Sequence, residues 1–159
     1  MSKYSHITVY TDGSCLGNPG YGGWAIVFVA DDNTEIETIC DSSKNITTNN
    51  IMELTAAIMG LQYCVTGKRF AAETVTIHTD SNYVKKGITE WITKWKKNNW
   101  TTVNKTLVKN RDLWEKLSFL DNSLNVDWQW VKAHANNKFN NKADKCAREM
   151  AKATQPLWQ

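Results

Sequence analysis

The sequence predicts an α/β domain built on a five-stranded mixed sheet flanked by helices. Three observations predict it. Three strand-like segments follow one another through short turns, two later strand-like segments each follow a helical stretch, and 42% of the 159 residues are hydrophobic. The last observation indicates a single folded core and excludes a disordered chain. A crossover helix delivers a parallel strand, so we expect the first three strands to be antiparallel and the fourth and fifth parallel to the first.

The first half of the chain predicts a meander. Strand-forming residues occupy 6–11 and 23–29, and a glycine-rich turn joins the two segments. The pair Asp32–Asn33 then turns the chain into a third strand at 35–40.

The second half alternates helices and strands. Apolar residues at helical spacing predict a helix from Ile51 to Val65, which Gly67 ends. Two helical stretches surround the segment rich in tryptophan and lysine. The remaining expected elements are a strand at 74–79, a helix near 111–120, a strand at 126–131 and a helix over about 140–153.

The expected sheet predicts where a ligand binds. In open α/β sheets, ligands collect outside the carboxyl ends of strands, where the strand order reverses. The first and fourth strands are expected to be parallel neighbours. We therefore expect a site near Asp12 and Asp80.

Four acidic residues in distinctive contexts are Asp12, Glu53, Asp80 and Asp144. Each fits a structural role when taken singly. Asp12 fits a turn with Gly13, and Glu53 fits a capping box begun by Asn50. Asp80 fits a helix cap after a strand, and Asp144 fits a surface pair with Arg148. Together, however, three carboxylates at one sheet edge repel one another unless a cation is present. Hard oxygen ligands favour Mg²⁺ or Mn²⁺, and such clusters hold two ions about 4 Å apart for displacement at phosphorus.

The glycine-rich segment 13–23 does not match a known phosphate-binding loop. It lacks the Gly-Lys-Ser/Thr ending of a P-loop, and it leads into a strand, so it also fails the dinucleotide fingerprint. Two interpretations of the segment remain. It is a hairpin loop whose residues need positive φ, or it exposes backbone that a nucleic acid approaches closely.

Charge is segregated along the chain, although the formal total is only +3. Residues 85–116 carry 9 basic and 3 acidic side chains, whereas residues 1–84 carry 4 and 9. Four of the 8 tryptophans fall in the basic segment. Trp91, Ile92 and Trp95 at helical spacing are typical of a packed amphipathic helix, but basic clusters beside aromatic residues also follow a phosphate backbone. We favour nucleic-acid binding.

The 4 cysteines form no Cys-x-x-Cys pair, which argues against a zinc site and favours reduced thiols. The amino terminus has no apolar signal core, and no apolar run approaches membrane-spanning length. We expect a cytoplasmic, monomeric protein without an obligate protein partner or a membrane association.

Several segments resemble the motifs of type 1 ribonuclease H. They are residues 11–20 (TDGSCLGNPG), 48–54 (TNNIMEL), 79–84 (TDSNYV) and 130–134 (WVKAH). Residues 95–100 (WKKNNW) and 108–114 (VKNRDLW) are similar to the basic protrusion of that family. The resemblance runs from about residue 7 to residue 151. It implies a ribonuclease H-like fold for a single catalytic domain, 1–159, with the protrusion at about 88–110.

The resemblance implies hydrolysis of the RNA strand of an RNA/DNA hybrid, leaving 5′-phosphate and 3′-hydroxyl ends. By this likeness two Mg²⁺ ions, or Mn²⁺, are the cofactors. Asp12, Glu53, Asp80 and Asp144 match the catalytic metal ligands. His134 matches a loop histidine that assists proton transfer or product departure.

The same resemblance implies three sets of substrate-binding residues. The set facing the minor groove of the hybrid, where 2′-hydroxyl groups identify RNA, comprises Asn18, Asn49, Asn50 and Asn82. Thr48 and Asn110 match a pocket for a phosphate of the DNA strand. The protrusion supplies Trp91, Trp95, Lys96 and Lys97.

Some positions depart from the family pattern. Ala133 replaces a glycine, Asn141 stands where an acid is common, and Ile46 replaces a basic residue for which Lys44 could substitute. The alternatives are a non-catalytic hybrid-binding module, a DNA-processing relative such as an integrase or junction resolvase, and a domain of a reverse transcriptase. Met1 and the lack of adjoining sequence favour a free-standing enzyme over the last of these.

Overall fold

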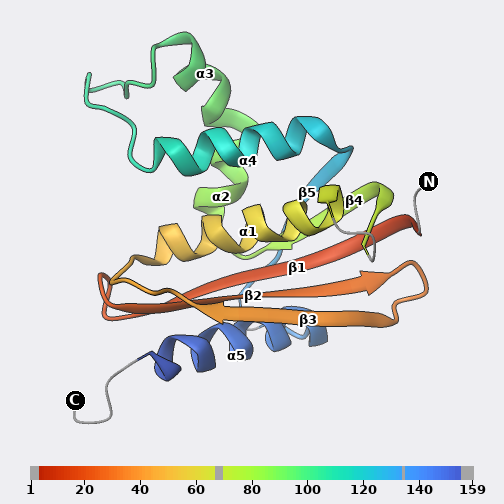
Figure 1. The fold of residues 1–159 in the computed structure, drawn as a ribbon. Helices are drawn as coiled ribbons and strands as arrows, with labels where there is room; N and C mark the ends of the chain where they lie inside the picture. Colours follow the sequence, from red (N-terminus) through yellow and green to blue (C-terminus); the bar gives the residue numbers. More distant parts are fainter. Residues whose placement is uncertain (1–3, 67–69, 134, 155–159) are drawn as a thin grey trace.

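A five-stranded sheet with the order β3-β2-β1-β4-β5 organises the computed structural model, which describes residues 4–66, 70–133 and 135–154 (Figure 1). The strands are β1 (Tyr4–Leu16), β2 (Tyr21–Ala30), β3 (Glu35–Ser42), β4 (Ala72–Thr79) and β5 (Val126–Trp130). The first three are antiparallel, and β4 and β5 run parallel to β1. The predicted fold class is therefore confirmed.

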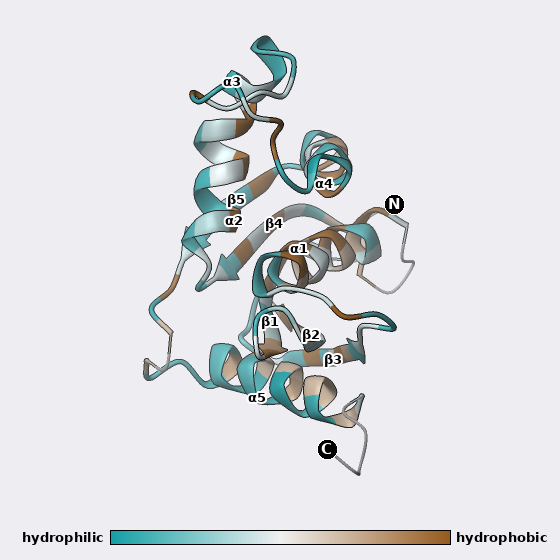
Figure 2. Cartoon of the chain, turned by 90° about the vertical axis from the view of Figure 1, so that its left-hand side faces the viewer, coloured by the Kyte–Doolittle hydropathy of each residue, from teal (hydrophilic) through white to brown (hydrophobic). Residues whose placement is uncertain are grey.

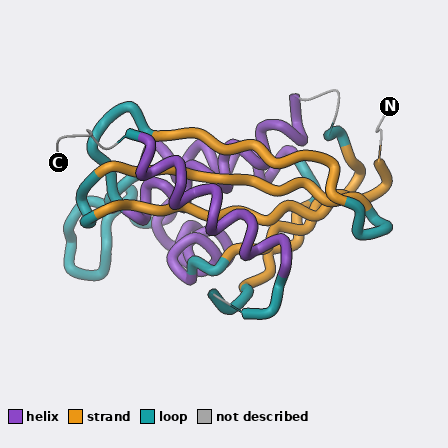
Figure 3. The backbone as a smooth tube through the Cα atoms, turned by 90° about the horizontal axis from the view of Figure 1, so that it is seen from below, coloured by secondary structure: helices purple, strands orange, loops and turns teal. Residues whose placement is uncertain are grey.

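Helices cover both faces of the sheet. They are α1 (Asn49–Thr66), α2 (Asn82–Lys86), the π-helical turn η1 (Gly87–Trp91), α3 (Ile92–Lys97), α4 (Arg111–Ser123) and α5 (Lys138–Ala153). Figures 1 and 3 show α5 alone on one face, whereas α1 lies on the other. Since strand side chains alternate between faces, Ile26 and Phe28 pack toward α1, whereas Ala25 and Val27 pack toward Phe139 of α5. Figure 2 shows apolar residues along α1 and the strands beneath it.

The first hairpin differs from the sequence prediction. A turn was expected from Gly13 onward, but β1 continues to Leu16 and pairs with β2 as far as Tyr21. The antiparallel partner strand supplies hydrogen bonds that local sequence preference does not reveal. Only residues 17–20 remain as the turn. The predicted end of α1 at Gly67 lies outside the described residues.

The segment from α2 to α3 is one helical path that projects beyond the sheet (Figure 1). Gly87, in its π-helical turn, lies directly against the buried ring of Trp114, and a Cβ atom there would lie 2.0 Å from that ring. The aromatic rings of Trp91, Trp95 and Trp100 follow one another at centroid distances of 5.9 and 6.1 Å. Glycine at this position therefore allows α4 to support the protrusion.

The four cysteines are free thiols. Among the described residues, no helix combines the length and apolar character needed to cross a membrane.

Candidate active site

The β1–β4 pairing brings two of the predicted acids to one edge of the sheet. The parallel ladder ends with Thr11 opposite Thr79; Asp12, the next residue of β1, and Asp80, the residue after β4, follow directly. Asp12 remains inside the antiparallel pairing of β1 with β2, opposite Ala25, and is 4% exposed. It is therefore a strand residue rather than part of a turn.

The capping of α1 leaves Glu53 for another role. The Thr48 hydroxyl accepts a hydrogen bond from the Ile51 backbone N–H at 3.2 Å, so Thr48 caps the helix and no capping box forms. Glu53 is buried, at 8% exposed, and its Oε1 accepts a hydrogen bond from the Gly13 backbone N–H. A Cβ atom at Gly13 would lie 2.4 Å from the Glu53 nitrogen, so only glycine permits this approach of β1 to α1.

Asp80 likewise does not cap the helix that follows it. The Ser81 hydroxyl accepts from the Val84 N–H at 3.1 Å and takes that role. The indole Nε1–H of Trp130 donates to the Asp80 main-chain oxygen at 3.0 Å and ties the end of β4 to the end of β5. The Asp80 side chain is left to line the cavity with the other acids.

The acids meet in one cavity of about 320 Å³. One carboxylate oxygen from each of Asp12, Glu53 and Asp80 lies within 4.8 Å of the others. Asp144 of α5 lines the same cavity, and its Oδ2 is 3.1 Å from Nη2 of Arg148, so the expected surface pair also forms. His134 lies outside the described residues.

Charge repulsion and burial dominate the electrostatics of this cavity. Burial raises the pKa of Asp12, and the nearby Glu53 charge raises it further. Burial also raises the pKa values of Glu53 and Asp80. Ionising these three carboxylates together is costly because they are close to one another and partly removed from water. Such a set of oxygen donors suits a hard divalent cation, whose charge would favour the ionised forms.

A second cavity, of about 330 Å³, adjoins the first because Asn50 lines both. It brings together Asn18, Thr48 and Asn110 from three distant segments. The Asn18 Oδ1 accepts from the Asn49 N–H at 3.1 Å, so Asn18 also fixes the start of α1. Lys109 lines this cavity and was not among the predicted binding residues, although its position beside Asn110 was a usable signal.

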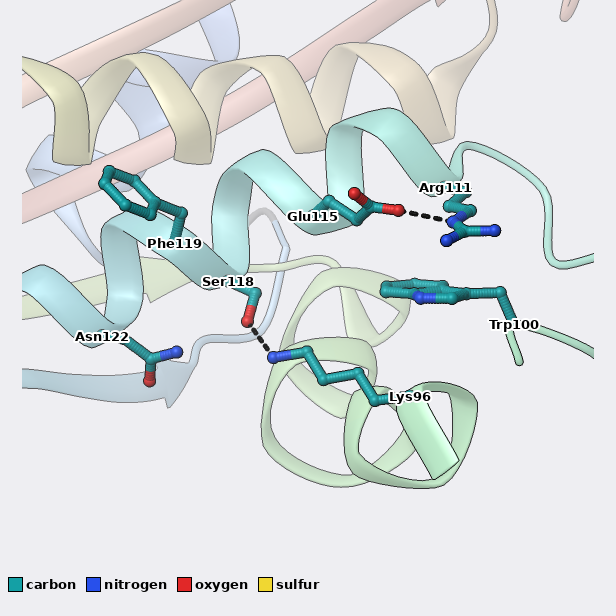
Figure 4. A pocket seen from close by; sticks show the side chains of 7 residues that line it. All are labelled: Lys96, Trp100, Arg111, Glu115, Ser118, Phe119 and Asn122. Atoms are coloured by element: carbon teal, nitrogen blue, oxygen red, sulfur yellow. Dashed lines mark hydrogen bonds and ion pairs between the residues drawn. The ribbon is translucent and has the colours of Figure 1, made fainter. Parts of the chain in front are cut away.

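A third cavity, of about 340 Å³, lies in the protrusion between Trp91, Trp95 and the loop that follows α3. It holds Lys94, which was also absent from the predicted binding residues. Lys96 instead points toward α4, where its Nζ donates to the Ser118 hydroxyl at 2.6 Å (Figure 4). Lys97 is exposed in the last turn of α3, and Asn82 is exposed at the start of α2.

The departures from the family pattern also have positions in the structure. Ala133 lines the acidic cavity. Asn141 donates from Nδ2 to the Ala135 main-chain oxygen at 3.1 Å, so it supports the segment that precedes α5. Ile46 is exposed.

The strand order and the carboxylates at the end of the β1–β4 ladder define a protein with the ribonuclease H-like fold. The RNase H family profile matches residues 4–152. The chain belongs to the RNase H family and is therefore a hydrolase of the ribonuclease H class.

Known relatives agree with this assignment. The chain is 51% identical to a ribonuclease H of Ehrlichia chaffeensis over 146 residues, which cover 92% of this chain and 94% of the relative. The crystal structure of LC9-RNase H1 is 27% identical, with a TM-score of 0.81, and the match covers 96% of this chain and 74% of that one. LC11-RNase H1, solved in complex with an RNA/DNA hybrid, shares the fold at 21% identity and a TM-score of 0.67, covering 94% and 99%.

Proposed function

We propose that the protein is an endoribonuclease that hydrolyses the RNA strand of RNA/DNA hybrids by a two-metal mechanism and leaves 5′-phosphate and 3′-hydroxyl ends. The observation that carries this proposal is the cluster of Asp12, Glu53 and the half-buried Asp80, with ligand oxygens within 4.8 Å of one another. The complex of LC11-RNase H1 with an RNA/DNA hybrid supports the choice of substrate.

Asp12, Glu53, Asp80 and Asp144 would hold Mg²⁺, or Mn²⁺ in its place. Their oxygen-only chemistry fits these hard cations better than zinc. Such ions, when bound, supply a more acidic water and stabilise negative charge on a leaving oxygen. The Gly13 N–H orients Glu53, and the Trp130 indole holds the main chain at Asp80, so the carboxylates are fixed before substrate arrives. By the family resemblance, His134 would accept or deliver a proton in this reaction.

The surface that recognises the hybrid would extend from the acidic cavity to the two other cavities. Asn49 and Asn50, exposed at the start of α1, and Asn82 at the start of α2 would donate to or accept from the 2′-hydroxyl groups of the RNA strand. Thr48 and Asn110 would hold a phosphate of the DNA strand. The same DNA strand would then run along the tryptophan-lined cavity of the protrusion.

The proposal is tested with end-labelled RNA/DNA, RNA/RNA and DNA/DNA duplexes incubated with and without Mg²⁺. We expect cleavage of the RNA in the hybrid alone and only with the metal. Ligation and kinase assays on the products would then report the 5′-phosphate. Equal cleavage of DNA/DNA, or binding of the hybrid without any cleavage at millimolar Mg²⁺, would contradict the proposal. The variant D12N is the inactive reference, and D32N, at an exposed turn, is its matched control.

A further inference from the structure

Tyr83 lies at a junction between the proposed phosphate cavity and the aromatic protrusion. Its hydroxyl accepts a hydrogen bond from Asn110 Nδ2 at 3.2 Å and another from Trp114 Nε1 at 3.1 Å. We propose that Tyr83 is a positioning residue that orients the Asn110 amide for binding a phosphate of the DNA strand. This inference rests on the proposed function, because it concerns how the same substrate is held.

The backbone at Asn110 explains why its side chain needs an external support. Asn110 occupies the N-cap position of α4 at φ 61°, and its side chain makes no capping hydrogen bond. Asparagine tolerates this left-handed conformation better than most residues. The amide is therefore not used to start the helix and instead lines the cavity with Thr48 and Lys109. Its NH₂ group has two hydrogens, so one can bond to Tyr83 while the other serves a ligand.

The ring of Tyr83 is itself firmly held. Its centroid is 5.1 Å from the fully buried ring of Trp114 and 6.3 Å from that of Trp91, in edge-on contacts. Since Trp114 Nε1 can only donate, the hydroxyl must accept from it, and this fixes where the remaining acceptor site points. The Tyr83 oxygen is thus a rigidly held acceptor for the Asn110 amide.

The position of Tyr83 in the chain gives the contact a functional consequence. The residue follows Asp80 by three positions, in the helix that begins where β4 ends. It also contacts Trp91, which lines the cavity of the protrusion. One side chain therefore contacts both a residue of the phosphate cavity, Asn110, and a residue of the tryptophan-lined cavity, Trp91. We expect its hydroxyl to set how accurately the DNA strand is held relative to the acids.

The test compares Y83F, N110A and the double variant with the wild type. Steady-state cleavage of a hybrid gives kcat and KM, and fluorescence anisotropy without metal gives Kd. Removing one hydrogen bond to a binding group is expected to raise KM and Kd about fivefold in Y83F, with kcat within about twofold of wild type. In the N110A background, Y83F should add no further effect, because the group it positions is gone.

The variant Y63F controls for the loss of a tyrosine hydroxyl elsewhere in the fold. Tyr63 packs against Phe28 and Phe70 and lines neither the phosphate cavity nor the tryptophan-lined cavity, so we expect Y63F to leave KM and Kd unchanged. The inference is overturned if Y83F keeps the wild-type KM and Kd, or if its full effect persists in N110A. A wild-type chain that binds the hybrid without cutting it would contradict the proposed function, and the Kd comparison would still decide the role of Tyr83. A failure to bind at all would overturn both.

Discussion

The acidic cavity and the basic protrusion are built in opposite ways. The acids come from four segments that are distant in sequence, and strand pairing and a glycine contact bring them into one cavity. The protrusion is one continuous stretch, in which α2, η1 and α3 follow without a break and the lysines remain at the surface. One region concentrates charge on side chains that are buried or half-buried, and the other spreads charge over side chains that solvent screens.

This difference predicts different responses to mutation. Buried like charges are strongly coupled, so changing one carboxylate alters activity, stability and pH dependence together. Exposed lysines act through long-range attraction that salt weakens, so each contributes a small and graded share. We therefore expect substitutions to have their largest effect in the acidic cavity and their smallest in the protrusion.

Replacing an acid of the cavity should remove activity almost completely. For D12N we expect kcat for hybrid cleavage to fall by roughly a thousandfold or more, because metal-assisted stabilisation of the transition state contributes several kcal/mol. Rates are measured at saturating Mg²⁺, with D32N as the control. Near-wild-type cleavage by D12N would show that Asp12 is not part of the catalytic centre.

The same change should stabilise the metal-free protein in a pH-dependent way. Burial raises the folded-state pKa of Asp12 above its unfolded value. Below the unfolded-state pKa, Asp12 is neutral in both states and costs no stability. As the pH rises from there toward the folded-state pKa, the free energy of unfolding declines, because only the unfolded state ionises easily. The free energy of unfolding of D12N, which stays neutral, should exceed that of wild type by several kcal/mol at pH 8 and by less than about 1 kcal/mol at pH 4.

Urea titrations in EDTA at the two pH values would measure this effect. Added Mg²⁺ should raise the stability of wild type more than that of D12N, because the ion offsets repulsion among the ionised acids. A D12N advantage that is equal at pH 4 and pH 8 would contradict the electrostatic cause.

A substitution at Trp130 tests whether metal binding by the acids depends on the hydrogen bond from Trp130 to the main chain of Asp80. In W130F the ring is largely kept, but the hydrogen bond to the Asp80 carbonyl is lost. Outer contacts of this kind position metal ligands, so we expect the Mg²⁺ concentration for half-maximal activity to rise about tenfold. W128F is the matched control, since its indole bonds Asp121 instead. An equal shift in both variants would indicate a general loss of stability.

The smallest effect is expected in the protrusion, where Lys94 and Lys96 can be compared directly. Lys94 lines the tryptophan cavity, whereas Lys96 is bonded to Ser118 on the side of α4. We expect K94Q to raise the Kd for a hybrid about threefold at low salt and to reduce the salt slope by about one, and K96Q to do less. The reverse order would favour the prediction made from the sequence.

The two regions also differ in how much of their structure could be predicted from local sequence. The expected parallel pairing placed Asp12 and Asp80 at one edge, and the structure has that pairing, because crossover connections restrict strand direction so strongly. The motif resemblance named Glu53 and Asp144 as well. Sequence spacing could not reveal that Thr48 and Ser81 take the capping roles, since Asn50 and Asp80 are equally good caps by residue type.

The sequence by itself determined the directions of the strands, the pairing of the first with the fourth, the separation of charge and the set of acids, because periodicity, connection rules and motifs are written in neighbouring residues. Only the tertiary structure decided which lysine faces the tryptophans, why Gly13 must be glycine, and that Tyr83 and Trp130 support the site. These depend on contacts between segments far apart in the chain, such as the Tyr83 hydroxyl with Asn110 and Trp114. The packing of the folded chain selects these hydrogen-bond partners, because many other side chains of the sequence have suitable donors and acceptors.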